Sequence, residues 1–121
     1  MPCEGEGGPQ ALTLPQAEEH LASLQSGWEI EHDEQKRLHL SRLWKTKNFL
    51  AALELSRRFG EVAEHEGHHP DVHITGWNRL KLVLWTHSRN GLTLNDFVLA
   101  AKLDDVDVQG LLWRKKKVEN L

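Results

Sequence analysis

Five side chains that can move or hold protons lie close together in the middle of the chain. Glu64, His68 and His69 come first, and His87 and Asp96 follow. Imidazole is the only side chain whose unperturbed pKa lies between 5 and 8, so it can donate or accept a proton near neutral pH. Carboxylates next to imidazoles can orient them. The group therefore indicates acid–base chemistry.

The histidine pair lies at the predicted end of the longest helix. Helical spacing runs over residues 48–66, and Gly67 and Pro70 end it, because proline disfavours the helical conformation at the residue before it. His68 and His69 therefore come just after a helix C-terminus. The predicted buried face holds Phe49, Leu53, Ser56, Phe59 and Ala63, with Ala52 and Val62 beside them.

The other two proton-handling residues are expected at the ends of later elements. Residues 71–75 form a predicted short strand, residues 76–78 a turn, and residues 79–87 a strand that ends at His87. Leu80, Leu82 and Leu84 point to one side of it, and Lys81, Val83, Trp85 and His87 to the other. Thr93 then caps a last helix of roughly residues 94–105, with Phe97, Ala100, Ala101 and Leu103 as its apolar members.

The first part of the chain predicts a helix and a hairpin. Thr13 is typical of an N-cap, Gly27 is expected to end the helix, and residues 28–31 and 37–44 alternate as two strands. The order is helix, strand, strand, helix, strand, strand, helix. Hairpin connections imply an antiparallel sheet, and the three helices need a shared surface to cover. We expect an α+β two-layer sandwich, with three helices on one face of a four-stranded antiparallel sheet.

Composition indicates one globular domain. The 121 residues are 39% hydrophobic and 27% charged, and the net charge of −3 gives no reason to expect nucleic-acid or membrane binding. No apolar run approaches the roughly 20 residues that span a bilayer. We expect a flexible lead-in over residues 1–12, the domain over 13–106 and a short extension over 107–121. The predicted location is the cytoplasm, or an organelle if a targeting segment has been removed.

Two kinds of metal site are alternatives to the acid–base interpretation. Residues 65–69 spell His-Glu-Gly-His-His, which matches the zinc-protease pattern, but that pattern needs a continuous helix and Gly67 lies inside it. A structural zinc site could instead use four histidines without cysteine partners. Its ligands would be His65, His68, His69 and His73.

Several of these residues also have simple structural explanations. Histidines near a helix C-terminus are favoured by the helix dipole, and Asp96 is placed to complete a capping box with Thr93. Glu64 could be a solvated helix carboxylate, and Trp77 could pack in a turn. The basic stretch at residues 114–117 is typical of a solvated tail rather than a nucleic-acid site.

The spacing of the whole group resembles the pterin-4a-carbinolamine dehydratase family. Its pattern is an acidic residue, three spacers, His-His-Pro, five or six spacers, an aromatic, nine spacers, a histidine, and an aspartate at least eight spacers on. All of these spacings are satisfied here within 33 residues, and the resemblance as a whole covers approximately residues 12–106. The matching positions are Glu64, His68, His69, Pro70, Trp77, His87 and Asp96.

The resemblance implies a hydro-lyase that converts 4a-hydroxytetrahydropterin to quinonoid dihydropterin and water, in tetrahydrobiopterin recycling. It also implies no metal or redox cofactor, because dehydration transfers no electrons. His69 would be the main acid–base residue. The implied catalytic residues are His68, His69 and His87, and the implied substrate-binding or orienting residues are Glu64, Pro70, Asp71, Trp77, Thr86 and Asp96.

The resemblance also carries one departure and one alternative. Animal members often have tryptophan two positions after the proline, where this chain has Val72, and Gly76-Trp77-Asn78 is similar to the bacterial and plant branch. Some members act as partners of other proteins, in transcription or in enzyme assembly. The alternative is therefore a non-enzymatic binding protein. The resemblance implies a homodimer or homotetramer assembled through the long helix, with no direct nucleic-acid or membrane partner.

Overall fold

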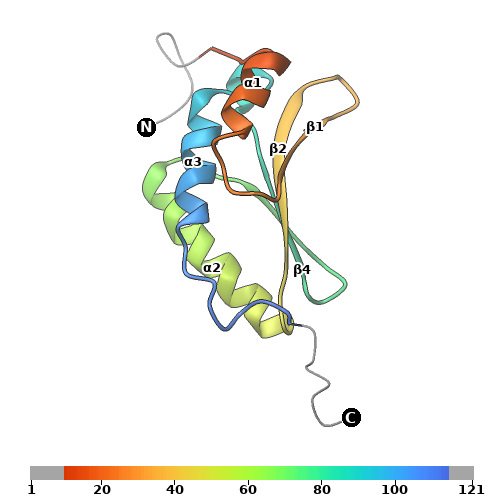
Figure 1. Ribbon diagram of the computed structural model, residues 1–121, viewed down its shortest axis with the longest axis vertical. Coiled ribbons are helices and arrows are strands. Elements are labelled where there is room, and N and C mark those ends of the chain that lie inside the picture. The colour runs from red at the N-terminus through yellow and green to blue at the C-terminus, as the bar shows by residue number, and fades with distance from the viewer. Residues whose placement is uncertain (1–9, 115–121) are drawn as a thin grey trace.

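Three helices cover one face of a four-stranded antiparallel sheet in the computed structural model, which describes residues 10–114 (Figure 1). The predicted α+β two-layer sandwich is confirmed. The elements are α1 (Leu14–Leu21), β1 (Trp28–His32), β2 (Leu38–Lys45), α2 (Phe49–Glu66), β3 (Asp71–Thr75), β4 (Arg79–Leu84), a 3₁₀ turn (His87–Arg89) and α3 (Leu94–Asp104).

The sheet has the strand order β1-β2-β4-β3, so its two hairpins meet where β2 pairs with β4. Leu40 is opposite Leu84 in that pair, and Leu82 is opposite Val72 in the next. Because side chains alternate across a strand, the even-numbered leucines all point toward the helices. The buried leucines of the sheet are Leu40, Leu80, Leu82 and Leu84.

Helix α2 begins and ends where the sequence predicts, but its buried face is rotated. The Asn48 side chain accepts a hydrogen bond from Ala51 N–H, and Gly67 ends the helix at φ 67°, a left-handed conformation that glycine adopts at little cost. The prediction that Phe49 and Leu53 are buried is wrong, since 49% and 43% of their surfaces are exposed. The residues that face the core are Ala51, Ala52, Leu55, Phe59 and Ala63.

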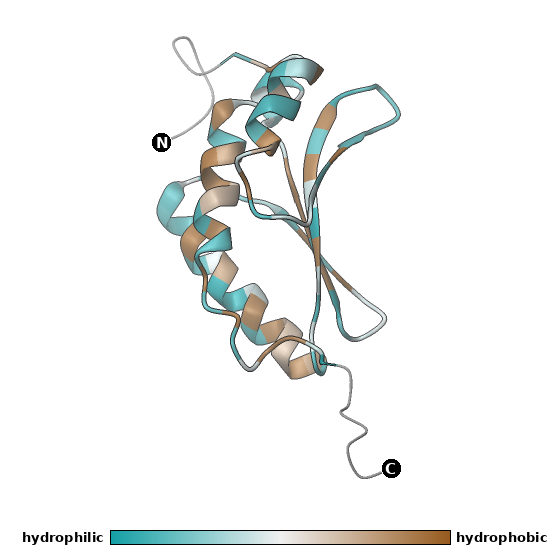
Figure 2. Ribbon diagram, in the orientation of Figure 1, coloured by the Kyte–Doolittle hydropathy of each residue, from teal (hydrophilic) through white to brown (hydrophobic). Residues whose placement is uncertain are grey.

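The physical reason for this rotation lies at the start of α2. Two adjacent alanines, Ala51 and Ala52, face the core there, and small side chains allow a close approach of helix and sheet. Phe49 and Leu53 are consequently turned outward. Figure 2 shows apolar colour on both the inner and outer sides of this end of the helix, which explains why hydropathy alone did not select the buried face.

Two further boundaries differ from the predictions. Helix α1 ends at Leu21, not at Gly27, which has φ +112° in the turn before β1. This φ lies in the region that L side chains rarely adopt, so the turn requires glycine. Strand β4 ends at Leu84, not at His87. Thr86 pairs instead with Gly91, and His87 begins the 3₁₀ turn.

The segments outside the predicted domain boundaries contact the sandwich where the structure describes them. Leu12 N–H donates to Leu92 O at 2.7 Å, and Trp113 N–H donates to Lys45 O at 2.9 Å. Of the predicted lead-in, residues 1–9 lie outside the described residues, as do residues 115–117 of the basic stretch. Over residues 10–114, no helix is long and apolar enough to cross a membrane.

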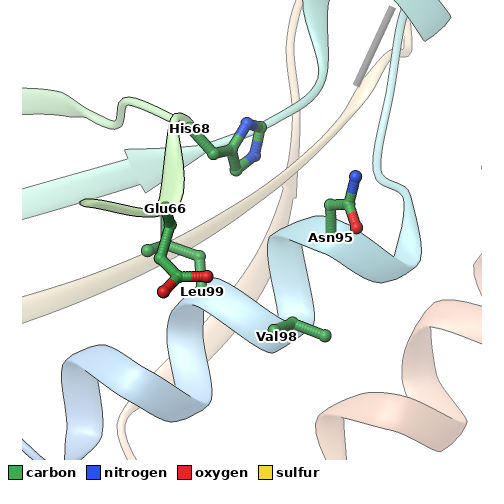
Figure 3. A pocket seen from close by; sticks show the side chains of 5 residues that line it. All are labelled: Glu66, His68, Asn95, Val98 and Leu99. Atoms are coloured by element: carbon green, nitrogen blue, oxygen red, sulfur yellow. The ribbon is translucent and has the colours of Figure 1, made fainter. Parts of the chain in front are cut away.

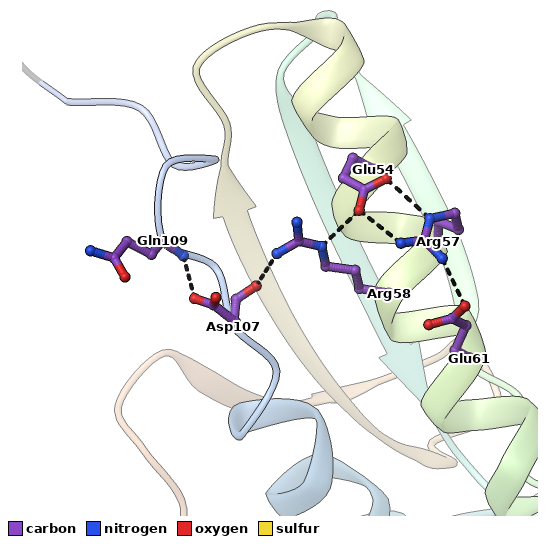
Figure 4. Close-up of polar contacts among 6 residues, drawn as sticks. All are labelled: Glu54, Arg57, Arg58, Glu61, Asp107 and Gln109. Atoms are coloured by element: carbon purple, nitrogen blue, oxygen red, sulfur yellow. Dashed lines mark hydrogen bonds and ion pairs between the residues drawn. The ribbon is translucent and has the colours of Figure 1, made fainter.

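Ion pairs run along the outer face of α2, and a hydrogen bond from Arg58 to a backbone carbonyl connects them to the C-terminal segment (Figure 4). Arg58 donates to Glu54 at 2.7 Å and to Asp107 O at 2.7 Å. Hydrogen bonds from Arg57 and then Arg58 lower the pKa of Glu54 from 4.5 to about 2. Glu54 is therefore charged throughout the neutral and mildly acidic range. Its ion pairs with Arg57 and Arg58 are lost only as the pH falls from about 4.5 toward 2.

A buried carboxylate at the end of α3 links the helix layer to the sheet. The side chain of Asp104 is 4% exposed and accepts hydrogen bonds from Arg42 Nη1 at 2.7 Å and Trp28 Nε1 at 2.8 Å. A buried charge is tolerated only when it is paired and hydrogen-bonded. Asp104 thus fixes α3 against β1 and β2.

Replacing Asp104 with alanine should lower the free energy of unfolding by about 3 kcal/mol, because Arg42 and Trp28 lose a charged acceptor in a buried setting. Urea denaturation measures the change. The exposed neighbour variant Asp105→Ala should stay within about 0.5 kcal/mol of wild type. Equal losses in the two variants would contradict the assigned role.

Candidate active site

The side chain of Asp96 is fully buried and joins three elements of the fold. Its Oδ2 accepts hydrogen bonds from Thr86 Oγ1 at 2.8 Å and from Thr93 N–H at 2.9 Å, and its Oδ1 lies 2.5 Å from His68 Nε2. Thr86 follows β4, Thr93 precedes α3, and His68 follows α2. The predicted contact of Asp96 with the N-terminus of its own helix is confirmed.

The hydroxyl groups around Asp96 form a short directed chain. Thr86 and Thr93 are both buried, and their side-chain oxygens lie 2.9 Å apart. Since the Thr86 hydroxyl donates to Asp96, the Thr93 hydroxyl is the donor in this second contact. The carboxylate thus faces donors on both oxygens, which fixes its orientation toward His68.

His68 is held at a rigid corner. Gly67 reverses the chain after α2, and His68 N–H donates to Ala63 O at 3.2 Å. The imidazole is 12% exposed, and its Nε2 contacts the Asp96 carboxylate. Because a carboxylate only accepts, the neutral ring carries its proton on Nε2 and its lone pair on Nδ1. His68 is thus an imidazole that a buried carboxylate orients.

A small hollow lies beside His68, between the end of α2 and the first turns of α3 (Figure 3). Its volume is about 60 Å³. The hollow opens to solvent on the side of His68 that faces α3. The residues around the hollow are Glu66, His68, Asn95, Val98 and Leu99.

His69 has an exposed carboxylate partner. Its Nε2 lies 2.9 Å from Glu64 Oε1, and the two side chains are 63% and 81% exposed. Glu64 is in the last turn of α2, five residues before His69. Unlike the His68 ring, this ring can therefore be reached from solvent.

His87 is brought to the same region by its neighbour Thr86. Thr86 contacts Asp96, and Asp96 contacts His68, so the start of the 3₁₀ turn lies next to the corner after α2. The His87 side chain is exposed and packs against Trp85, with ring centroids 4.0 Å apart and an interplanar angle of 70°. No carboxylate orients this ring among the residues that the structure describes.

The fold brings together all but one of the predicted site residues. Pro70 and Asp71 follow the histidine pair, and Asp71 begins β3 opposite Val83. Trp77 lies in the turn at the other end of β3, roughly 15 Å away at the usual rise per residue of a strand. Its side chain is 58% exposed beside Lys45, Arg79 and Trp113. Within one chain, Trp77 does not join the histidines.

A cluster around Trp85 was not predicted as part of the site. His39 stacks on Trp85 with ring centroids 4.5 Å apart, and the Arg37 guanidinium lies 4.7 Å from the same ring. Asp33 accepts from Arg37 Nε at 2.6 Å. In the sequence, Trp85 and His39 are merely outward-facing strand positions, and only the pairing of β2 with β4 brings them together.

The charge on Asp33 is stabilised within this cluster. Burial alone would raise the pKa of its carboxyl, but hydrogen bonds from Arg37 N–H, Arg37 Nε and Gln35 N–H outweigh burial and lower the pKa to about 2. His39 Nε2 lies 3.2 Å from Asp33 Oδ2, outside the geometry of a hydrogen bond. Asp33 therefore stays ionised and keeps Arg37 in place over most of the pH range.

A family model and curated relatives of this chain point to the same protein family. The family model described as pterin 4 alpha carbinolamine dehydratase matches residues 10–106. The chain is 43% identical over 118 residues to "Pterin-4-alpha-carbinolamine dehydratase 2, mitochondrial" of Arabidopsis thaliana, covering 98% of this chain and 61% of the relative. The chain belongs to the pterin-4a-carbinolamine dehydratase family.

Other members of the family match over most of their length. A protein of Rickettsia canadensis (strain McKiel), named provisionally for the same dehydratase, is 38% identical over 104 residues, which are 86% of this chain and 89% of that protein. The crystal structure of a transcriptional coactivator/pterin dehydratase from Brucella melitensis superposes with a TM-score of 0.66 at 32% identity. The match covers 78% of this chain and 96% of the other.

The metal alternatives gain no support from the geometry of this family member. Helix α2 ends at Glu66, within the residues that match the zinc-protease motif. His65 is 86% exposed and contacts Glu66. Over residues 10–114, no three side chains among histidine, cysteine, aspartate and glutamate gather in a group that could hold a metal ion.

The contact with Asp96 predicts the tautomer of His68. Nitrogen-detected NMR of ¹⁵N-labelled protein, at a pH where the ring is neutral, should show His68 with its proton on Nε2. The exposed His32 serves as a control in the same spectrum and should show both tautomers. A neutral His68 with its proton on Nδ1 would contradict the assigned geometry.

Proposed function

We propose that this chain is a 4a-hydroxytetrahydropterin dehydratase that works by histidine acid–base catalysis. The observation that carries the proposal is the buried Asp96, which holds His68 at the corner next to His69 and contacts Thr86 next to His87. Family membership over residues 10–106 supports the same substrate class.

The proposed reaction breaks one carbon–oxygen bond. The substrate carries a hydroxyl at carbon 4a and a proton on a ring nitrogen. A general acid protonates the hydroxyl, which leaves as water, while the nitrogen's electrons form the new double bond and a base accepts its proton. The products are quinonoid dihydropterin and water. Hydroxide alone is a poor leaving group, and each positioned proton transfer can contribute roughly 10²–10⁴-fold in rate.

The three histidines differ in how they are held, which supports a division of labour. His69 is the proposed main acid at the hydroxyl-bearing carbon, because it is exposed and its protonated ring would carry a second proton on Nδ1, away from Glu64. His68, held by Asp96, is proposed to bind the pterin and to assist proton transfer. His87 would assist from the 3₁₀ turn.

The proposed mechanism uses no metal or redox cofactor, since the dehydration changes no oxidation state. Its physiological context would be the recycling of tetrahydrobiopterin. The cytoplasmic location stays a prediction. The mitochondrial name of the Arabidopsis relative supports an organelle as the alternative.

The purified protein should accelerate the loss of synthetic 4a-hydroxytetrahydropterin over buffer, followed by ultraviolet absorbance. His69→Ala should lower kcat by about 10²-fold, because the general acid is lost. His87→Ala should also lower kcat, and the exposed variant His32→Ala serves as the control with wild-type activity.

One outcome would overturn this proposal, and a second would overturn only the role assigned to His69. Wild-type protein that gives no acceleration over buffer would remove the dehydratase assignment. A pH–rate profile of His69→Ala that matches wild type in shape and rate would remove the assigned role of His69 and leave the reaction in place.

Self-assembly through α2 is a second proposal, supported by an exposed apolar patch. Phe49, Leu50 and Leu53 are 49%, 74% and 43% exposed and lie on one side of the first turns of α2. We propose that this patch buries itself in a homodimer or homotetramer. The same surface supports the alternative of a protein-binding cofactor, which is in keeping with the coactivator name of the Brucella protein.

The double substitution Leu50→Glu and Leu53→Glu should convert the assembly to a monomer of 13.9 kDa, because it places charges in the proposed interface. Light scattering after size-exclusion chromatography measures the mass. Leu14→Glu, at an exposed leucine of α1, should keep the wild-type mass. An unchanged mass for the double variant would contradict assembly through this patch.

A further inference from the structure

The third histidine of the site is supported differently from the other two. His68 contacts the Asp96 carboxylate and His69 contacts the Glu64 carboxylate, each within hydrogen-bonding distance. Among the described residues, the His87 side chain packs against the ring of Trp85. A ring contact leaves both imidazole nitrogens able to bond with a substrate.

Trp85 can restrain His87 because Trp85 is itself held. The pairing of Leu40 with Leu84 places His39 next to Trp85 on the sheet face away from the helices, and the two rings stack at 4.5 Å with an interplanar angle of 26°. The Arg37 guanidinium also lies 4.7 Å from the Trp85 ring centre. Stacked aromatic and cation–aromatic contacts of this kind favour one orientation of the ring.

The support reaches back to the turn of the first hairpin. Asp33 Oδ1 accepts from Arg37 N–H at 3.0 Å and Oδ2 accepts from Arg37 Nε at 2.6 Å, so both ends of the arginine are tied to one carboxylate. Arg37 is thereby positioned to lie over Trp85. A continuous set of contacts connects the turn between β1 and β2 to the 3₁₀ turn that carries His87.

We infer that Trp85 is a positioning residue for His87, and that the cluster of Asp33, Arg37 and His39 holds Trp85 in place. This inference rests on the proposed dehydratase function, in which His87 assists proton transfer. The cluster positions the His87 ring, as Asp96 positions the His68 ring. It restrains the ring without occupying either nitrogen, so that both can serve the substrate.

The test combines kinetics with an NMR signal of His87. Trp85→Leu keeps apolar bulk but removes the ring, and it should lower kcat by about tenfold with a smaller change in KM, because misplacement of a reacting group reduces the chemical step. The ring protons of His87 should also lose the ring-current shift that Trp85 causes. Trp85→Phe should restore most of kcat and part of that shift.

Two further variants separate this role from general stability. Trp113→Leu removes another half-exposed tryptophan, one that contacts Lys45 instead, and should leave kcat and the His87 signals unchanged. Arg37→Met changes a partly exposed side chain, so the fold should persist while kcat falls by about two- to threefold. If Trp85→Leu does not fold, the same measurements on Arg37→Met and Trp85→Phe decide between the two roles.

The outcomes distinguish this inference from the function on which it rests. A wild-type protein without dehydratase activity overturns both. If the wild type is active and Trp85→Leu keeps the wild-type kcat and the wild-type His87 signals, the inference alone is overturned. If Trp85→Leu does not fold, the same result for Arg37→Met overturns the inference alone.

Discussion

The buried carboxylate of Asp96 is the constraint on which the arrangement of the site depends. A charge with no exposed surface is costly unless it is paired and hydrogen-bonded. Asp96 meets that requirement with Thr86 after β4, Thr93 before α3 and His68 after α2. Satisfying one carboxylate therefore fixes the relative positions of three segments of the fold.

The three histidines around this centre differ in burial and in their contacts, and that difference suits a reaction with two proton transfers. His68 is nearly buried beside Asp96, His69 is exposed beside an exposed carboxylate, and His87 packs against an aromatic ring. A fixed ring can define where the substrate binds, while an exposed ring can adjust as the hydroxyl leaves. Because these side chains are already held in place, less of the substrate's binding energy is needed to orient them.

The order of the elements and the position of the histidine pair after α2 depend on local signals, so they could be predicted from the sequence. The caps at Thr13, Asn48 and Thr93 and the stop at Gly67 are local, and they put the histidine pair at the end of α2. The buried face of α2, the early end of β4 and the distance of Trp77 from the histidines depend on tertiary packing. The contact of His39 with Trp85 likewise arises only from the register between two strands.

A crystal structure of the protein with a dihydropterin bound tests the proposed site most directly. The ring carbon that bears the hydroxyl in the substrate should lie within hydrogen-bonding reach of His69, with the pterin also contacting His68 and His87 and with Asp96 still bound to His68. A pterin bound at the other end of the sheet, between Trp77 and Trp113, with the three histidines left uncontacted, would contradict the proposed site.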